Sequence, residues 1–308
     1  MTFELIIILF GLILFEIVSS IDNAVINAQV LTTVSPQAKR WFLSWGLFIS
    51  VFLVRGLLPL VIVFLANPSL GIGGTFMASF SSDPSVTAAI EMSKPILLAG
   101  GGLYLVLLFL HWLLIENVHF AFDYERTLHQ RFGLWFYALA SILLVAITYM
   151  SVSTSPMVAL GAVIGSSAFF ITSGFKANAE TKETELISGK TASSDISKIL
   201  YLELIDATFS IDGVLGAFAF TTAVPLILIG NGIGAIIVRQ ITIKGINVVN
   251  RLPFLTNGAM YSVAVLGSIM LLESRHIDVP FFVTPLVTVI VVGYFGWRSW
   301  RSSAGQFA

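Results

Sequence analysis

The sequence predicts an all-α protein, a polytopic membrane helix bundle with about nine transmembrane helices. Of its 308 residues, 56% are hydrophobic and only 11% are charged, and the mean hydropathy is +0.93. An average soluble domain carries about 25% charged residues, so a water-soluble fold and a disordered chain are both excluded. The formal net charge of −1 offers no basic surface for nucleic acid. The chain has no cysteine, which excludes disulfides, thiolate catalysis and Cys-ligated metals.

Nine runs are long and apolar enough to be spans, because the core of a bilayer needs about 20 apolar residues per helix. They cover residues 3–31, 43–65, 95–115, 132–150, 156–175, 199–221, 224–244, 254–272 and 280–297. Strands do not fit, because the runs are too long and lack the alternation of barrel strands.

The distribution of basic residues predicts the orientation. Twelve of the sixteen Lys and Arg residues fall in loops that follow odd-numbered spans, and only Lys94 and Arg275 fall on the other side. Cytoplasmic loops carry the excess of basic residues. The N-terminus is therefore expected outside and the C-terminus in the cytoplasm.

Three connections between the spans are long. Residues 66–94 are rich in Gly, Ser and Pro and are expected to form an external loop. Residues 116–131 have the spacing of an amphipathic helix at the membrane surface. Residues 176–198 hold many Lys and Glu residues and are expected to form a mobile cytoplasmic linker.

Two polar stretches inside apolar runs match each other, EIVSSIDN at 16–23 and DATFSIDG at 206–213. Acid aligns with acid, Ser with Ser and Asp with Asp at one fixed offset: Glu16 with Asp206, Ser20 with Ser210, and Asp22 with Asp212. In the next span of each half, Arg55 and Arg239 each follow a glycine by nine residues. These matches predict an internal repeat.

The repeat is expected to be inverted, since five crossings separate its two starts. Inverted repeats are typical of secondary transporters, whose substrate sites lie near the bilayer midplane. The chain then divides into a first repeat (1–115, spans 1–3), a linker with two spans and a cytoplasmic loop (116–198), and a second repeat with a final helix (199–308, spans 6–8 and beyond).

The acids of the motifs are the candidate metal ligands. Each charge buried in a membrane costs about 2.5–3.5 kcal/mol, so the four acids must face one another, a cavity or a cation. Ser-Ile-Asp-Asn and Ser-Ile-Asp-Gly are poor helix sequences, and a break there would turn the carboxylates into one cavity. Carboxylate and neutral oxygens suit Mg²⁺, Ca²⁺ or Mn²⁺. The expected neutral donors are Asn23, Asn27, Ser20 and Ser210.

The two arginines are expected to be counter-ions of the motif acids. An alternative is that the acids only form salt bridges with Arg55 and Arg239 and bind no metal. Glu203 has no acidic repeat mate and is expected to line a vestibule or reach the membrane surface.

At "EIVSSIDNAV", "ELIDATFSIDGV" and the following arginines, the sequence resembles the TerC family of integral membrane proteins, within the LysE-like transporter superfamily. The resemblance covers residues 5 to 295. It implies manganese export and, carried over by position, an ion-binding set of Glu16, Asp22, Asn23, Asp206 and Asp212. Gly213 departs from the pattern, because many members have Ser at that position.

The sequence therefore predicts a secondary transporter that exports a divalent cation, Mn²⁺ before Ca²⁺, in exchange for protons. No catalytic residue, resident cofactor or nucleic-acid partner is expected; the partners are the cation, protons and lipid. An exporter of an amino acid or another small cationic metabolite is the main alternative. A membrane enzyme and a structural scaffold are weaker alternatives, since no His-carboxylate motif or Ser/Lys pair lies in a span.

Overall fold

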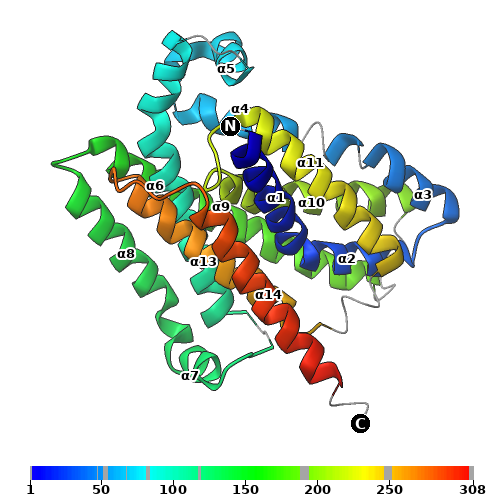
Figure 1. The fold of residues 1–308 in the computed structure, drawn as a ribbon. Coiled ribbons are helices and arrows are strands. Elements are labelled where there is room, and N and C mark those ends of the chain that lie inside the picture. Colours follow the sequence, from blue (N-terminus) through cyan, green and yellow to red (C-terminus); the bar gives the residue numbers. More distant parts are fainter. Residues whose placement is uncertain are drawn as a thin grey trace.

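The computed structural model describes residues 2–46, 48–50, 55–66, 68–80, 84–116, 119–187, 194–245 and 252–304. For part of these ranges, including Asp22 and residues 84–93 and 179–187, only the backbone is described. Every regular element among the described residues is a helix (Figure 1). This confirms the predicted all-α fold of a polytopic membrane protein.

The helices of the first half are α1 (Thr2–Ser19), α2 (Ile21–Leu31), α3 (Pro36–Trp41), the π-helix η1 (Phe42–Gly46), α4 (Arg55–Ala66), the 3-10 turn η3 (Pro68–Leu70), α5 (Gly71–Phe80) and α6 (Pro84–Leu114). The remaining helices are α7 (Asp123–Phe132), η4 (Gly133–Trp135), α8 (Phe136–Ser151), α9 (Pro156–Ile187), α10 (Asp195–Ala217), α11 (Val224–Gln240), η5 (Ile241–Gly245), α13 (Leu255–Glu273) and α14 (Val283–Ala304).

Five helices are long and apolar enough to cross a membrane: Lys94–Leu114, Asp123–Ser151, Pro156–Asn178, Val224–Ile243 and Leu255–Glu273. The bent pair Phe3–Ser19 and Asn23–Leu31 would make a sixth. The predicted count of nine is therefore not confirmed. The span expected at 199–221 coincides with α10, which carries Glu203, Asp206 and Asp212. The one expected at 280–297 coincides with α14, which ends in the polar sequence WRSWRSSA.

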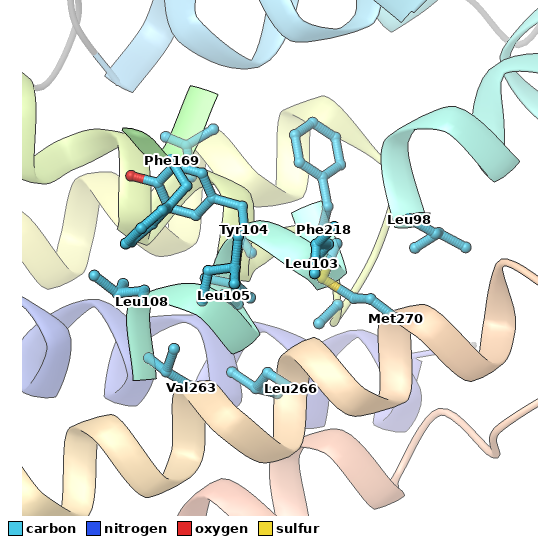
Figure 2. Close-up of a cluster of buried hydrophobic side chains, with 14 of the residues drawn as sticks. Leu98, Leu103, Tyr104, Leu105, Leu108, Phe169, Phe218, Val263, Leu266 and Met270 are labelled. Atoms are coloured by element: carbon cyan, nitrogen blue, oxygen red, sulfur yellow. The ribbon is translucent and has the colours of Figure 1, made fainter. Parts of the chain in front are cut away.

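The α6 helix lies at the centre of one layer of the bundle, where it packs against α9 and α13. Leu105 and Leu108 of α6 face Val263 and Leu266 of α13 in the buried cluster of Figure 2. On its other side, the ring of Tyr104 lies edge-on to that of Phe169, with centroids 5.9 Å apart. The α1, α2, α10 and α11 helices lie beside this layer (Figure 1).

Glycines bring the backbones of this layer together. A Cβ atom on Gly102 would lie 2.9 Å from the carbonyl oxygen of Gly267, and one on Gly267 would lie 2.8 Å from that of Gly102. Small residues at such contacts are typical of helix pairs in membranes, where close packing replaces the hydrophobic effect. By contrast, only 11% of the 18-residue apolar stretch in Asp123–Ser151 is buried inside the protein, so this apolar helix presents its side chains to lipid.

Two of the expected connections are helical. The segment 66–94 contains η3, α5 and the first turns of α6, with Pro84 as the first residue of α6, a position that proline tolerates. The expected linker 176–198 is helical up to Ile187 and again from Asp195, and residues 188–193 lie outside the described residues. The amphipathic helix expected within 116–131 is present as α7, and its place at the membrane surface stays a prediction.

Candidate functional site

The first motif breaks its helix, as the sequence predicts. The α1 and α2 axes differ by 55°, and Ser20 is the single non-helical residue between them. The Ser20 hydroxyl donates to the Glu16 carboxylate over 3.1 Å, so its side chain is directed to the acid one turn before it. The bend places Glu16 at the end of α1 and Asn23 and Asn27 on α2.

The second motif does not break its helix, contrary to the prediction of two broken helices. The α10 helix continues from Asp195 to Ala217. The Ser210 hydroxyl donates to the carbonyl oxygen of Asp206 on its own helix, a bond compatible with an unbroken helix. Gly213 serves close packing here, because a Cβ atom on it would lie 2.6 Å from Oε2 of Glu16. Glycine therefore allows the first motif to approach the second.

Arg55 joins the two motifs at the centre of the site. Its Nε donates to Glu16 Oε1 over 2.9 Å, and its Nη1 donates to Asp206 Oδ2 over 3.2 Å. All three side chains are buried, with 3%, 1% and 6% of the residue surface exposed for Arg55, Glu16 and Asp206. Arg55 is thus the counter-ion of one acid from each motif, as the sequence predicts.

Neutral side chains donate the other hydrogen bonds to Asp206. The Asn23 amide donates to Oδ1 over 2.5 Å. The Ser50 hydroxyl donates to Oδ2 and accepts from Arg55. The sequence did not indicate Ser50, because a single serine before Arg55 is not a distinctive pattern.

A cavity of about 10 Å³ opens beside Asp206, which is about the room of one water molecule. The side chains that line it come from both halves of the chain: Asn23, Asn27, Ser50, Arg55, Asp206, Ala235, Val238, Arg239 and Thr242. The amide oxygens of Asn23 and Asn27 are buried and have no hydrogen-bond partner. Buried acceptors without a donor are costly, so these oxygens are available to a ligand with positive charge or a proton to donate.

Arg239 lies at the same cavity but pairs with a different acid. Its Nη2 lies 3.8 Å from Oε1 of Glu203, and its guanidinium lies 3.9 Å from the centre of the Phe42 ring. Glu203 precedes Asp206 by one helical turn and thus shares its face of α10. The i, i+3 spacing of Glu203 and Asp206 in the sequence already indicates this shared face, although Glu203 has no acidic mate in the repeat.

Asp212 lies in a separate cluster. Tyr104 donates to its Oδ1 over 2.6 Å, and Lys176 of α9 forms an ion pair with its Oδ2. The side chain of Asp22 lies outside the described residues. Of the five predicted ligands, the structure therefore brings together Glu16, Asn23 and Asp206, and it gives Asp212 the partners Tyr104 and Lys176 instead. Among the described residues, no group of three His, Cys, Asp or Glu side chains is arranged to hold a metal ion.

Comparison with known proteins shows the family of the chain. A family described as "Protein of unknown function (DUF475)" matches residues 21–304. The chain belongs to the DUF475 family. It is also similar to "Uncharacterized membrane protein YceF" of Bacillus subtilis (strain 168), with 28% identity over 82 residues, which are 27% of this chain and 32% of that protein. The alignment thus spans about a third of that relative's length. No solved structure matches the chain.

These matches and the apolar helices make this DUF475 member a multi-pass membrane protein. The narrower resemblance to the TerC family stays a prediction. The matched range covers α2, α4, α10, α11 and η5, and these helices supply every residue of the cavity lining except Ser50, which lies in the same range.

Proposed function

We propose that this protein is a secondary transporter that exports a divalent metal cation, with Mn²⁺ as the expected ion, in exchange for protons. One observation carries the proposal. Buried carboxylates from two helices, Glu16 and Asp206, share the guanidinium of Arg55 as their counter-ion, and Asp206 lines a cavity in which the amide oxygens of Asn23 and Asn27 have no hydrogen-bond partner.

The donor chemistry supports a hard cation. Two carboxylates, the oxygens of Asn23 and Asn27, and the Ser50 hydroxyl form an all-oxygen set. Oxygen ligands suit Mn²⁺, Mg²⁺ and Ca²⁺, whereas thiolate and imidazole would favour zinc or copper. Arg55 occupies the position between the carboxylates, so a cation that binds both of them must displace its guanidinium.

The resemblance to the TerC family favours Mn²⁺ within this group of ions. It also adds Asp22 to the proposed ligands, next to Asn23 on α2. Asp212 belongs to the set by sequence position, but its ion pair with Lys176 gives it a partner of its own.

The cavity dimensions bear on the alternative of amino-acid export. Arg239 Nη1 and Nη2 have no acceptor and would suit a substrate carboxylate. However, a cavity of about 10 Å³ has no room for an amino acid. A single dehydrated ion is therefore the better fit to this conformation.

The experiment is uptake into liposomes that contain the purified protein, with Mn²⁺, Ca²⁺, Mg²⁺ and lysine as substrates. We expect Mn²⁺ uptake by the wild type and none by Asp206→Asn, because this change removes a charge that no other described residue of the cavity lining supplies. Glu116→Gln is the control, since Glu116 is half-exposed and pairs with His111 instead. Uptake of lysine without any metal would favour the alternative and contradict the proposal.

A further inference from the structure

Glu203 and Arg239 form a buried pair of opposite charges that does not close into hydrogen bonds. Only 11% of the Glu203 side chain and 6% of the Arg239 side chain are exposed. Both carboxylate oxygens of Glu203 and both terminal nitrogens of Arg239 lack a hydrogen-bond partner. The distance of 3.8 Å between them is too long for an N–H···O bond, which is about 2.9 Å.

The neighbours of the pair explain why it stays open. The guanidinium of Arg239 lies over the Phe42 ring, a favourable cation–π contact. The Glu203 carboxylate occupies the space that a side chain on Gly46 would fill. Phe42 and Gly46 both belong to η1, so this one π-helix packs against both members of the pair. An ion pair with a purely structural role would be stabilised by two parallel hydrogen bonds between guanidinium and carboxylate. Buried polar groups without a hydrogen-bond partner call for another explanation, such as a functional role or a bound ion.

The pair lies next to the cavity and toward one end of α10. Arg239 contacts Glu203 and also lines the cavity with Asp206. Glu203 is nearer than Asp206 to the start of α10 at Asp195, and the predicted topology places that start in the cytoplasm. A cation moving from the cytoplasm to Asp206 along this helix would therefore meet Glu203 first.

We propose that Glu203 and Arg239 form an outer cation-binding position on the cytoplasmic route to the cavity, where an arriving divalent cation displaces Arg239 from Glu203. This inference rests on the proposed transport function and adds a second binding position to it. Phe42 holds the guanidinium while Glu203 binds the cation, and the cation then moves one helical turn to Asp206.

The test measures Mn²⁺ uptake into inside-out membrane vesicles, in which the cytoplasmic face is outermost. Glu203→Gln should raise the Mn²⁺ concentration for half-maximal uptake about tenfold, because the outer position loses its charge. Arg239→Gln should lower that concentration, because the competing guanidinium is gone. Gly46→Ala should act like Glu203→Gln without any change of charge, since the new methyl group displaces the carboxylate.

Opposite effects of the first two variants distinguish the proposal from a structural role. If the pair only stabilised the fold, Glu203→Gln and Arg239→Gln would both lower the amount of folded protein. The Mn²⁺ concentration for half-maximal uptake by the remaining folded protein would then be unchanged. Calorimetry on Glu203→Gln should still detect Mn²⁺ binding to the inner site. Glu116→Gln is the matched control and should behave as wild type.

The outcomes also separate this inference from the function on which it rests. Absence of Mn²⁺ uptake by the wild type would overturn the proposed function. Wild-type uptake together with unchanged half-saturation in Glu203→Gln and Gly46→Ala would overturn the outer position alone.

Discussion

Arg55 illustrates how one buried residue can satisfy two acids that would otherwise repel each other. It donates to Glu16 and Asp206 from different helices, with almost no solvent exposure. Removing one partner of a buried ion pair costs about 3–5 kcal/mol, because the other charge stays behind without compensation. The same arrangement makes the carboxylates accessible to any cation that replaces the guanidinium.

Arg55→Gln should therefore destabilise the metal-free protein by about 3–5 kcal/mol and make its stability depend on Mn²⁺. We expect Mn²⁺ to raise the melting temperature of the variant more than that of the wild type, since binding to the folded state stabilises it. Thermal unfolding in detergent with and without Mn²⁺ measures this.

Lys176→Gln is the control for Arg55→Gln, because it also removes the cation of an ion pair, here a partly buried one. We expect it to be destabilised without any response to Mn²⁺. A response equal to that of Arg55→Gln would place Asp212 among the ligands, as the sequence predicts. An Arg55→Gln protein that is as stable as the wild type and insensitive to Mn²⁺ would contradict the role of Arg55.

Part of this site was predictable from sequence and part was not, for physical reasons. Glu16 and Asp206 were predicted because a charge in an apolar run is costly, so that it must face a partner, a cavity or a ligand. The contact of Ser50 with Asp206 depends on the packing of two helices distant in the sequence. The separation of Asp212 from the site likewise depends on Lys176 reaching it from α9, which no spacing in the second motif indicates.

At the level of helices, local composition predicted that the helices exist better than it predicted where they begin, end or break. Ser and Asn in the first motif break the helix, whereas the matching Ser and Gly in the second do not. Gly213 is retained inside α10 because Glu16 packs against it, so the same residue type that loosens an isolated helix here allows close approach. The segments 66–94 and 176–198 were expected to be loops because of their polar or small residues, yet most of their described residues are helical.

The contact between α6 and α9 gives a prediction at this scale. A Cβ atom on Gly165 would overlap the carbonyl oxygen of Gly100, whereas one on Gly174 of the same helix meets nothing within 4 Å. Gly165→Ala should force the two helices apart and cost about 1–3 kcal/mol. Gly174→Ala, the matched control, should not lower stability, since alanine favours helix more than glycine does. Thermal unfolding of both variants tests this, and equal melting temperatures would contradict the close packing.

At the scale of the whole molecule, the orientation in the membrane is the central prediction. The start of α1 and the end of α14 lie at opposite ends of the bundle in Figure 1. The bias of basic residues predicts that the N-terminus is outside and the C-terminus in the cytoplasm. A fluorescent reporter fused after Ala308 should therefore fold in the cytoplasm, and a reporter that needs export should be active within 66–94. An external reporter at the C-terminus would contradict both the orientation and the inverted repeat.

Charge balance across the whole transport cycle predicts how export is driven. In the described ion pairs of Arg55 and Arg239, the carboxylates of Glu16, Asp206 and Glu203 outnumber the two guanidinium groups by one. A bound divalent cation adds two positive charges, so its departure leaves negative charge inside the membrane, and uncompensated charge there costs several kcal/mol. Protons that bind after the cation leaves would remove this cost and make the cycle an exchange.

We therefore expect a pH gradient with an acidic lumen to drive Mn²⁺ into inside-out vesicles. A gradient of one pH unit should support about tenfold accumulation for each proton exchanged, because one unit corresponds to about 1.4 kcal/mol. Added Mn²⁺ should in turn raise the pH of the lumen, which a trapped dye reports. Asp206→Asn should abolish both signals, whereas Glu116→Gln should retain them. If Mn²⁺ uptake by the wild type is the same with and without the gradient and leaves the pH of the lumen unchanged, the cation moves without proton exchange, and Arg55 alone must balance the charge of the returning site.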